Sequence, residues 1–141
     1  KKMVSQIIST VDYFREHAII KENQMVHAII SFPKLIGDFN SNKIWDVWDR
    51  WWNHSDVVDK LNKMNILSFY HKYYEQEQGE ELTPTYFHWK KLEKEFHIDY
   101  VFGSEKIYKN LQNMEIGQYD NWIDVSDHMP MILNMNFILK K

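Results

Sequence analysis

The stretch LIGDFNSN places an acid and an amide at the end of an apolar run, as Asp38 and Asn40. Side chains two places apart on a strand point to the same side, so this carboxylate and this carboxamide would project together. Such a pair suits a hard cation together with a phosphate oxygen or an oriented water. The alternative is an Asx turn that closes the strand and has no chemical role.

Two further stretches, HIDYVF and SDHMP, carry Asp99 and the pair Asp127 and His128. A carboxylate inside an apolar strand is costly to bury without a partner, so Asp99 either reaches solvent or holds a histidine in one tautomer. Pro130 favours an extended or turning backbone after His128. A neighbouring Asp and His would by themselves also fit a capping acid beside a surface histidine.

In this order, the motifs IGDFNSN, HIDYVF and SDHMP resemble the endonuclease/exonuclease/phosphatase superfamily. Its members include exonuclease III-type and pancreatic-type deoxyribonucleases, inositol polyphosphate phosphatases, deadenylases and sphingomyelinases. The resemblance covers about residues 35 to 132 and includes TPTYFHW between the motifs. It implies an α/β fold, a four-layered sandwich of two packed, mostly antiparallel sheets flanked by helices, of which this chain would form the carboxyl-terminal half.

The resemblance also implies roles for the motif residues. Asp38 would position or deprotonate an attacking water, and Asn40 would hold the scissile phosphate or Asp38 itself. His128 would contact the phosphate or act as the base, and Asp99 would pair with His128. Asp127, together with Asp38, would bind Mg²⁺ or Mn²⁺. The implied function is a metal-dependent, nuclease-like phosphoesterase, and phosphoryl transfer does depend mainly on positioning and charge neutralisation.

Other functions remain open at this point. The substrate could be a nucleic acid, a small-molecule phosphate or a lipid phosphodiester, and the chain could be an inactive fragment that serves as a binding module. The family's first half normally supplies a glutamate ligand in a Gln-Glu pair, but neither Glu16 nor Glu22 follows a glutamine. Family members are also about twice this long. We therefore expect a single partial domain that binds Mg²⁺ poorly alone and exposes apolar sheet surface for its missing half or another chain.

Composition narrows the class of protein. The chain has 141 residues, 44% hydrophobic and 16% aromatic, which is enough to bury a core, and its net charge of −3 is unlike that of a non-specific nucleic-acid binder. The absence of cysteine excludes disulfides and thiolate metal sites. The seven histidines show no short spacing typical of zinc. No apolar run suits a membrane span, and without a signal pattern we expect a cytoplasmic protein unless an upstream signal was removed.

Periodicity predicts alternating helices and strands, hence a layered α/β domain. A helix is expected over residues 3–14, a strand over 26–36, and a helix capped by Ser55. Further strands are expected at these places: 65 onward, 85–91, 96–104 and 131–139.

Two unusual segments are interpreted as structural. Four tryptophans follow the first motif and are expected to form local core, with a stacking wall beside a substrate as the alternative: Trp45, Trp48, Trp51 and Trp52. The acidic run EQEQGEE is expected to be a solvated loop. His54 is expected to cap a helix or lie on the surface, with a substrate-side loop as the alternative, and His97 is expected to pack, with a phosphate contact as the alternative.

Overall fold

The computed structural model describes residues 34–136, so the helix expected over 3–14 and most of the strand expected over 26–36 lie outside the described part. The described chain mixes helices with antiparallel sheets, as the α/β prediction requires. Its elements follow in this order: β1 (Lys34–Asp38), η1 (Lys43–Trp45), α3 (His54–Lys63), β2 (Ile66–Ser68), α4 (Phe69–Tyr74), β3 (Tyr86–Phe87), η2 (His88–Lys90), β4 (Glu95–Phe96), β5 (Asp99–Ser104), α5 (Glu105–Tyr108), β6 (Leu111–Ile116), α6 (Tyr119–Trp122) and β7 (Met131–Met135).

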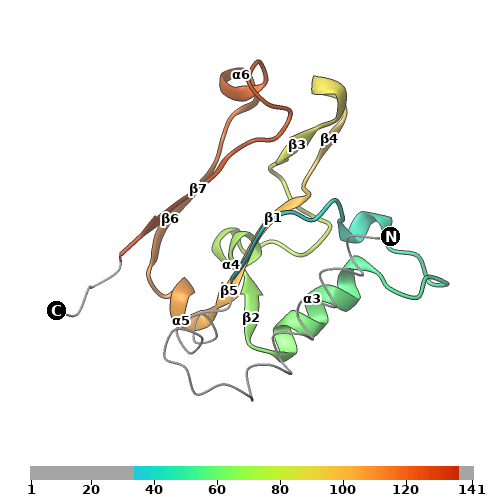
Figure 1. The fold of residues 1–141 in the computed structure, drawn as a ribbon, viewed down its shortest axis with the longest axis vertical. Coiled ribbons are helices and arrows are strands. Elements are labelled where there is room, and N and C mark those ends of the chain that lie inside the picture. The colour runs from blue at the N-terminus through green and yellow to red at the C-terminus, as the bar shows by residue number, and fades with distance from the viewer. Residues whose placement is uncertain (1–33, 137–141) are drawn as a thin grey trace, which may run out of the picture.

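A three-stranded sheet in the order β1-β5-β2 occupies the centre of the molecule (Figure 1). β5 runs antiparallel to both neighbours, and its register places Asp38 directly opposite Asp99. A long hairpin of β6 and β7 and a short hairpin of β3 and β4 complete the strands (Figure 1). The chain ahead of β7 also meets β3, through a bridge between Tyr86 and His128.

Alternation along β5 divides the core into two clusters, one on each face of the sheet. Tyr100 and Phe102 are fully buried on the face that α3 covers, while Val101 packs on the opposite face with α4, α5 and the β6–β7 hairpin. The first cluster comprises Phe39, Val57, Val58, Leu61, Ile66, Tyr100 and Phe102. The second comprises Phe69, Tyr70, Phe87, Val101, Ile107, Met114, Ile116 and Met129. By the same alternation, Asp99 belongs to the face of Val101.

Several local predictions need correction. Helix α3 begins at His54 after Asn53, whose N–H donates to Asp56 at 2.8 Å, so Ser55 is not the cap. The segment 65–74 forms a three-residue strand and then helix α4, because the aromatic residues of α4 cover the sheet. Residues 85–91 form only the two-residue β3 before η2. The period-two alternation of burial expected at the carboxyl end is present along β7.

The tryptophan segment is not local core as a whole. Trp48 is 97% exposed and Trp51 is 87% exposed, although Trp52 packs against the α3 cluster and Trp45 contacts the ring of Phe96. Only one turn of 3₁₀ helix forms here, η1 over Lys43–Trp45. Within residues 34–136, no helix combines the length and the apolar character that crossing a bilayer requires.

Candidate functional site

Two carboxylates meet across the first strand pair. Asp38 ends β1, Asp99 begins β5, and the antiparallel register sets the two residues opposite each other. Side chains of directly opposite residues lie on one face of a sheet within about 5.5 Å at Cβ. Like charges at such positions repel, so the fold accepts an electrostatic cost here that a cation or a proton donor would relieve.

Asn40 reaches this place by a turn, not by strand alternation. β1 ends at Asp38, and Asn40 has a left-handed backbone with φ of 44°, so the premise that both side chains project from one strand is wrong. The Asn40 N–H donates to Asp38 Oδ1 at 2.6 Å, which is an Asx turn. This bond fixes the Asp38 carboxylate with one oxygen occupied and leaves the exposed Asn40 side chain next to it.

The hydrogen bond expected between Asp99 and His128 is present. His128 Nδ1 donates to Asp99 Oδ2 at 2.9 Å, and the His128 side chain is 34% exposed while that of Asp99 is 16% exposed. The ring of Tyr86 packs against the imidazole with 4.6 Å between ring centroids. Because Nδ1 carries the proton toward Asp99, Nε2 is the nitrogen that can meet a ligand.

Thr85 holds the two halves of this pair together, and sequence reasoning missed it. Its side chain is fully buried, and its Oγ1 accepts the N–H groups of Ile98 and Asp99, both at 3.0 Å. Its carbonyl accepts the N–H of Met129 at 2.7 Å. One residue thus fixes the start of β5 and the segment that carries His128. The TPTY sequence gave no sign of this, because all three bonds are made to residues distant in the chain.

The environment raises the pKa of Asp99 above its ordinary value. Burial is the largest cause and the charge of Asp38 acts in the same direction, while the hydrogen bonds from His128 and Thr85 oppose it. The donors around Asp99 therefore favour its ionised form against burial and the Asp38 charge. An acid in this state is suited to stabilising a positive charge on the neighbouring imidazole.

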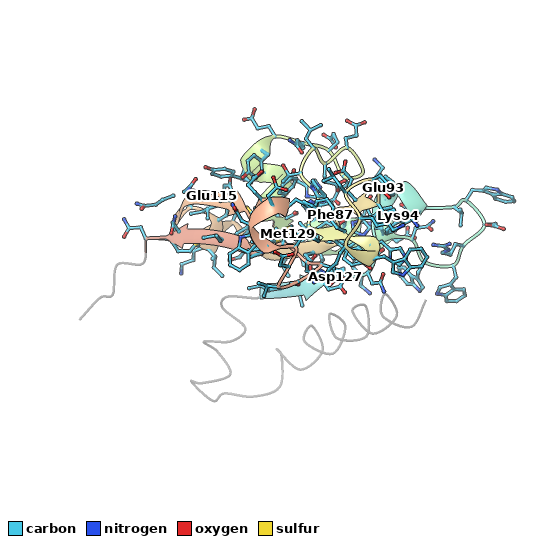
Figure 2. The ribbon with its side chains drawn as sticks, turned by 90° about the horizontal axis from the view of Figure 1, so that it is seen from above. Phe87, Glu93, Lys94, Glu115, Asp127 and Met129 are labelled. Atoms are coloured by element: carbon cyan, nitrogen blue, oxygen red, sulfur yellow. The ribbon has the colours of Figure 1, made fainter. Side chains whose placement is uncertain are left out.

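Asp127 is placed next to the site by its backbone. Its carbonyl accepts the Phe87 N–H at 2.8 Å, two residues before Met129 bonds to the carbonyl of Thr85. Phe87, Asp127 and Met129 lie near the middle of the molecule in Figure 2. The Asp127 side chain is half-buried, and no bond from it to Asp38, Asp99 or His128 is present among the described residues.

The described residues supply oxygen donors for a hard cation but no closed cage. Within residues 34–136, no group of three or more His, Asp or Glu side chains is arranged to hold a metal ion. Mg²⁺ is commonly bound through one or two carboxylates, with water and phosphate oxygens completing its shell. The exposed carboxylate of Asp38 fits that kind of partial ligation, and the half-buried Asp127 carries a ligand group of the same type.

An apolar cleft of about 500 Å³ opens beside Asp99, between the central sheet and the β6–β7 hairpin. Asp99 is the only charged residue among those that line it; the others are Ile36, Gly37, Phe69, Tyr100, Val101, Ile107, Met129, Met131, Leu133 and Met135. Ile36 on β1 is 68% exposed. Ile36 is an exposed apolar side chain, but cleft residues such as Phe69 and Val101 are buried, so the apolar sheet surface expected for a missing half stays a prediction.

Comparison with known proteins adds no assignment: no family model matches the chain, and no curated protein is significantly similar to it. The family resemblance therefore depends on the sequence motifs alone.

Replacing Asp38 by Asn tests whether the two strand-end acids face each other. Asp38→Asn removes the opposing charge but keeps an oxygen that can accept the Asn40 N–H, so the pKa of Asp99 should fall. A carboxyl ¹³C NMR titration measures this shift. Asp59→Asn, on the exposed side of α3, is the matched control and should leave Asp99 unchanged. An equal Asp99 pKa in wild type and Asp38→Asn would contradict the arrangement.

Proposed function

We propose that the chain is a metal-dependent phosphoesterase, nuclease-like, that hydrolyses a phosphate ester by attack of water on phosphorus. The observation that carries the proposal is the Asp99–His128 hydrogen bond, set beside Asp38 at the adjoining strand end. A buried acid that orients a half-exposed histidine next to a second acid is an arrangement typical of hydrolytic sites. The order of the three motifs supports the same class.

In this proposal each side chain has a defined task, and Asp38 has a second one as a metal ligand. Asp38, fixed by its bond from the Asn40 N–H, orients the attacking water and takes its proton. His128 donates from Nε2–H to a phosphate oxygen and stabilises the charge that builds there, while Asp99 accepts from Nδ1–H and holds the ring in place. Asn40 donates from its exposed amide to the phosphate.

Mg²⁺ or Mn²⁺ is the cofactor implied by the proposal, with Asp38 and Asp127 as the residues of this chain that would hold it. The bound ion would supply charge neutralisation at the phosphate oxygens. Oxygen donors on two acids are the ligand type that such an ion prefers, which supports the assignment.

The finer fold belongs to the proposal as well. Two antiparallel sheets with helices on the outside are what one half of a four-layered sandwich would contain, and the central sheet and the β6–β7 hairpin support this view. The substrate is a phosphate ester, with nucleic acid favoured over small-molecule and lipid phosphoesters on the strength of the family resemblance alone.

A second candidate is an inactive chain that serves as a binding module. The observation favouring it is that residues 34–136 contain no group of three potential metal ligands. The two candidates differ in whether His128 matters for turnover.

His128→Ala should reduce turnover by about 10²–10⁴-fold, because general acid–base or charge-stabilising groups contribute that much. The assay uses the protein translated from its whole reading frame, with Mg²⁺ and three substrates: plasmid DNA, abasic duplex and inositol phosphates. The free energy of unfolding should change by only about 1 kcal/mol, since the side chain is 34% exposed.

The matched control is His88→Ala, which also removes an imidazole bonded in this region, to the Tyr86 hydroxyl at 2.8 Å, but leaves Asp99 and His128 intact. It should keep wild-type turnover. An unaltered rate in His128→Ala would remove this histidine from the mechanism.

The isolated chain of 141 residues should bind Mg²⁺ weakly, because the acids described here offer too few ligands for a tight site. Isothermal titration of Mg²⁺ measures this, with Asp127→Asn expected to weaken binding further. Micromolar affinity together with sustained turnover would show that other residues complete the site.

A further inference from the structure

Three histidines lie buried on the face of β5 opposite Asp99. The rings of His54, His71 and His97 surround Tyr100, with centroid distances of 5.1, 6.1 and 5.2 Å respectively. His54 and His97 are each 4% exposed. Together with their polar partners these residues form what we call the histidine latch: His54, His71, His97, Asn42, Gln78 and Glu81.

One amide links two of the imidazoles. His54 Nε2 donates to Gln78 Oε1 at 3.0 Å, and the Gln78 amide nitrogen donates to His71 Nδ1 at 3.1 Å. The Ser68 hydroxyl also bonds His71 Nδ1, at 2.7 Å, and His71 Nε2 donates to Glu81 Oε1 at 2.9 Å. In both rings Nε2 donates to a side-chain oxygen and Nδ1 lies against a polar side-chain group.

Asn42 connects the latch to the segment after the Asx turn. Its side-chain nitrogen lies 3.1 Å from Glu81 Oε2 and 2.8 Å from the His97 carbonyl, and its Oδ1 accepts the Ile44 N–H at 2.9 Å. Asn42 is 2% exposed. The polar run EQEQGEE is therefore not a wholly solvated loop, because the Glu81 side chain is only 4% exposed.

Ser41, the residue after Asn40, is also bonded to this group of residues. Its hydroxyl bonds His54 Nδ1 at 3.2 Å, and its carbonyl accepts the Tyr100 hydroxyl at 3.2 Å. The chain leaving the Asp38–Asn40 turn is thus held at Ser41 by His54 and by Tyr100 of β5. At Asn42 it is held by Glu81 and the His97 carbonyl.

The latch contains more imidazoles that could take up a proton than carboxylates that could pair with the resulting charges. Of the three imidazoles, only that of His71 is hydrogen-bonded to a carboxylate, Glu81, while the Asp46 carboxylate is bonded to the backbone N–H of His54. His97 Nδ1 donates to the Thr83 carbonyl, and its Nε2 is buried with no hydrogen-bond partner. A proton on that atom would place an unpaired N–H and a charge in the interior, which is costly.

Lowering the pH therefore destabilises the closed latch. Burial lowers the pKa of His97 to about 4 and also lowers that of His54; Glu81, Asp46 and Thr83 oppose these shifts, and His71 adds to them. In an opened or unfolded latch His54 and His97 would bind protons from about pH 6.5 downward, whereas burial opposes this in the closed latch. Its stabilising effect is thus complete above about pH 6.5 and is lost as the pH falls toward 4.

We propose that the histidine latch positions the Asp38–Asn40 turn and releases it when acid loads the buried imidazoles with protons. The groups that face these imidazoles are Glu81, Asp46, Tyr70, Tyr100 and Thr83. The consequence for turnover rests on the proposed function, but the latch itself does not.

The test removes the protonation sites and keeps the hydrogen bonds. In His54→Gln/His97→Asn, amide nitrogens can replace the ring donors to Gln78 and to the Thr83 carbonyl without titrating. Urea unfolding at about pH 7.5 and about pH 5 should show a large fall of the midpoint in wild type and less than half that fall in the double variant. Glu80→Gln, beside Glu81 but exposed, should behave as wild type. An equal fall in the double variant would overturn the proposal.

A second measurement decides the matter if the double variant does not fold. An NMR titration of the wild-type imidazoles should show His97 neutral down to about pH 5 while the folded signals weaken. Ordinary titration of His97 with the folded state intact would overturn the latch. In the turnover assay, the acid limb should move to lower pH in the double variant. Turnover with an unmoved acid limb would refute the coupling, whereas no turnover at any pH would refute only the proposed function.

Discussion

The hydrogen bond between Asp99 Oδ2 and His128 Nδ1 joins residues 29 positions apart, and the arrangement of the site depends on it. A mostly buried carboxylate opposite another acid is unstable without donors. His128 and Thr85 supply these donors, and Thr85 also ties the His128 segment to β3 and β5. The same bonds that make the charge tolerable thereby orient the imidazole. The bonds that stabilise the Asp99 charge therefore also set the geometry of the site.

β5 supports two polar systems because successive side chains point to opposite faces. Asp99 faces the cleft, and Tyr100, its neighbour, is packed among the histidines of the latch. The turn of Asp38 and Asn40 is closed by the bond from the Asn40 N–H to Asp38. It is followed by Ser41, which bonds His54, and by Asn42, which bonds the His97 carbonyl. The Asp38–Asn40 turn, which could act on a ligand, is therefore held in place by buried latch residues that do not themselves face the cleft.

The strands and the three motifs could be predicted because they depend on local alternation and on short-range order in the sequence. The partners of Thr85, Glu81 and His54 could not, since each bond spans many residues and leaves no periodic trace. Exposure of Trp48 and Trp51 was missed for a related reason: apolar side chains indicate core only when the chain around them can pack. The site residues themselves were named from resemblance, and the structure supplies the register that sets Asp38 opposite Asp99 and the 2.9 Å bond between Asp99 and His128.

The most direct test of the central pair is the tautomer of His128, read from the ¹⁵N chemical shifts and one-bond couplings of its ring at neutral pH. The account requires a proton on Nδ1, donated to Asp99, which leaves Nε2 as the nitrogen that faces the phosphate and that must carry its own proton to donate to a phosphate oxygen. It also requires that Asp99→Ala shift the ring toward the mixed tautomers of a free imidazole. A wild-type ring protonated on Nε2 and bare at Nδ1 would contradict the account.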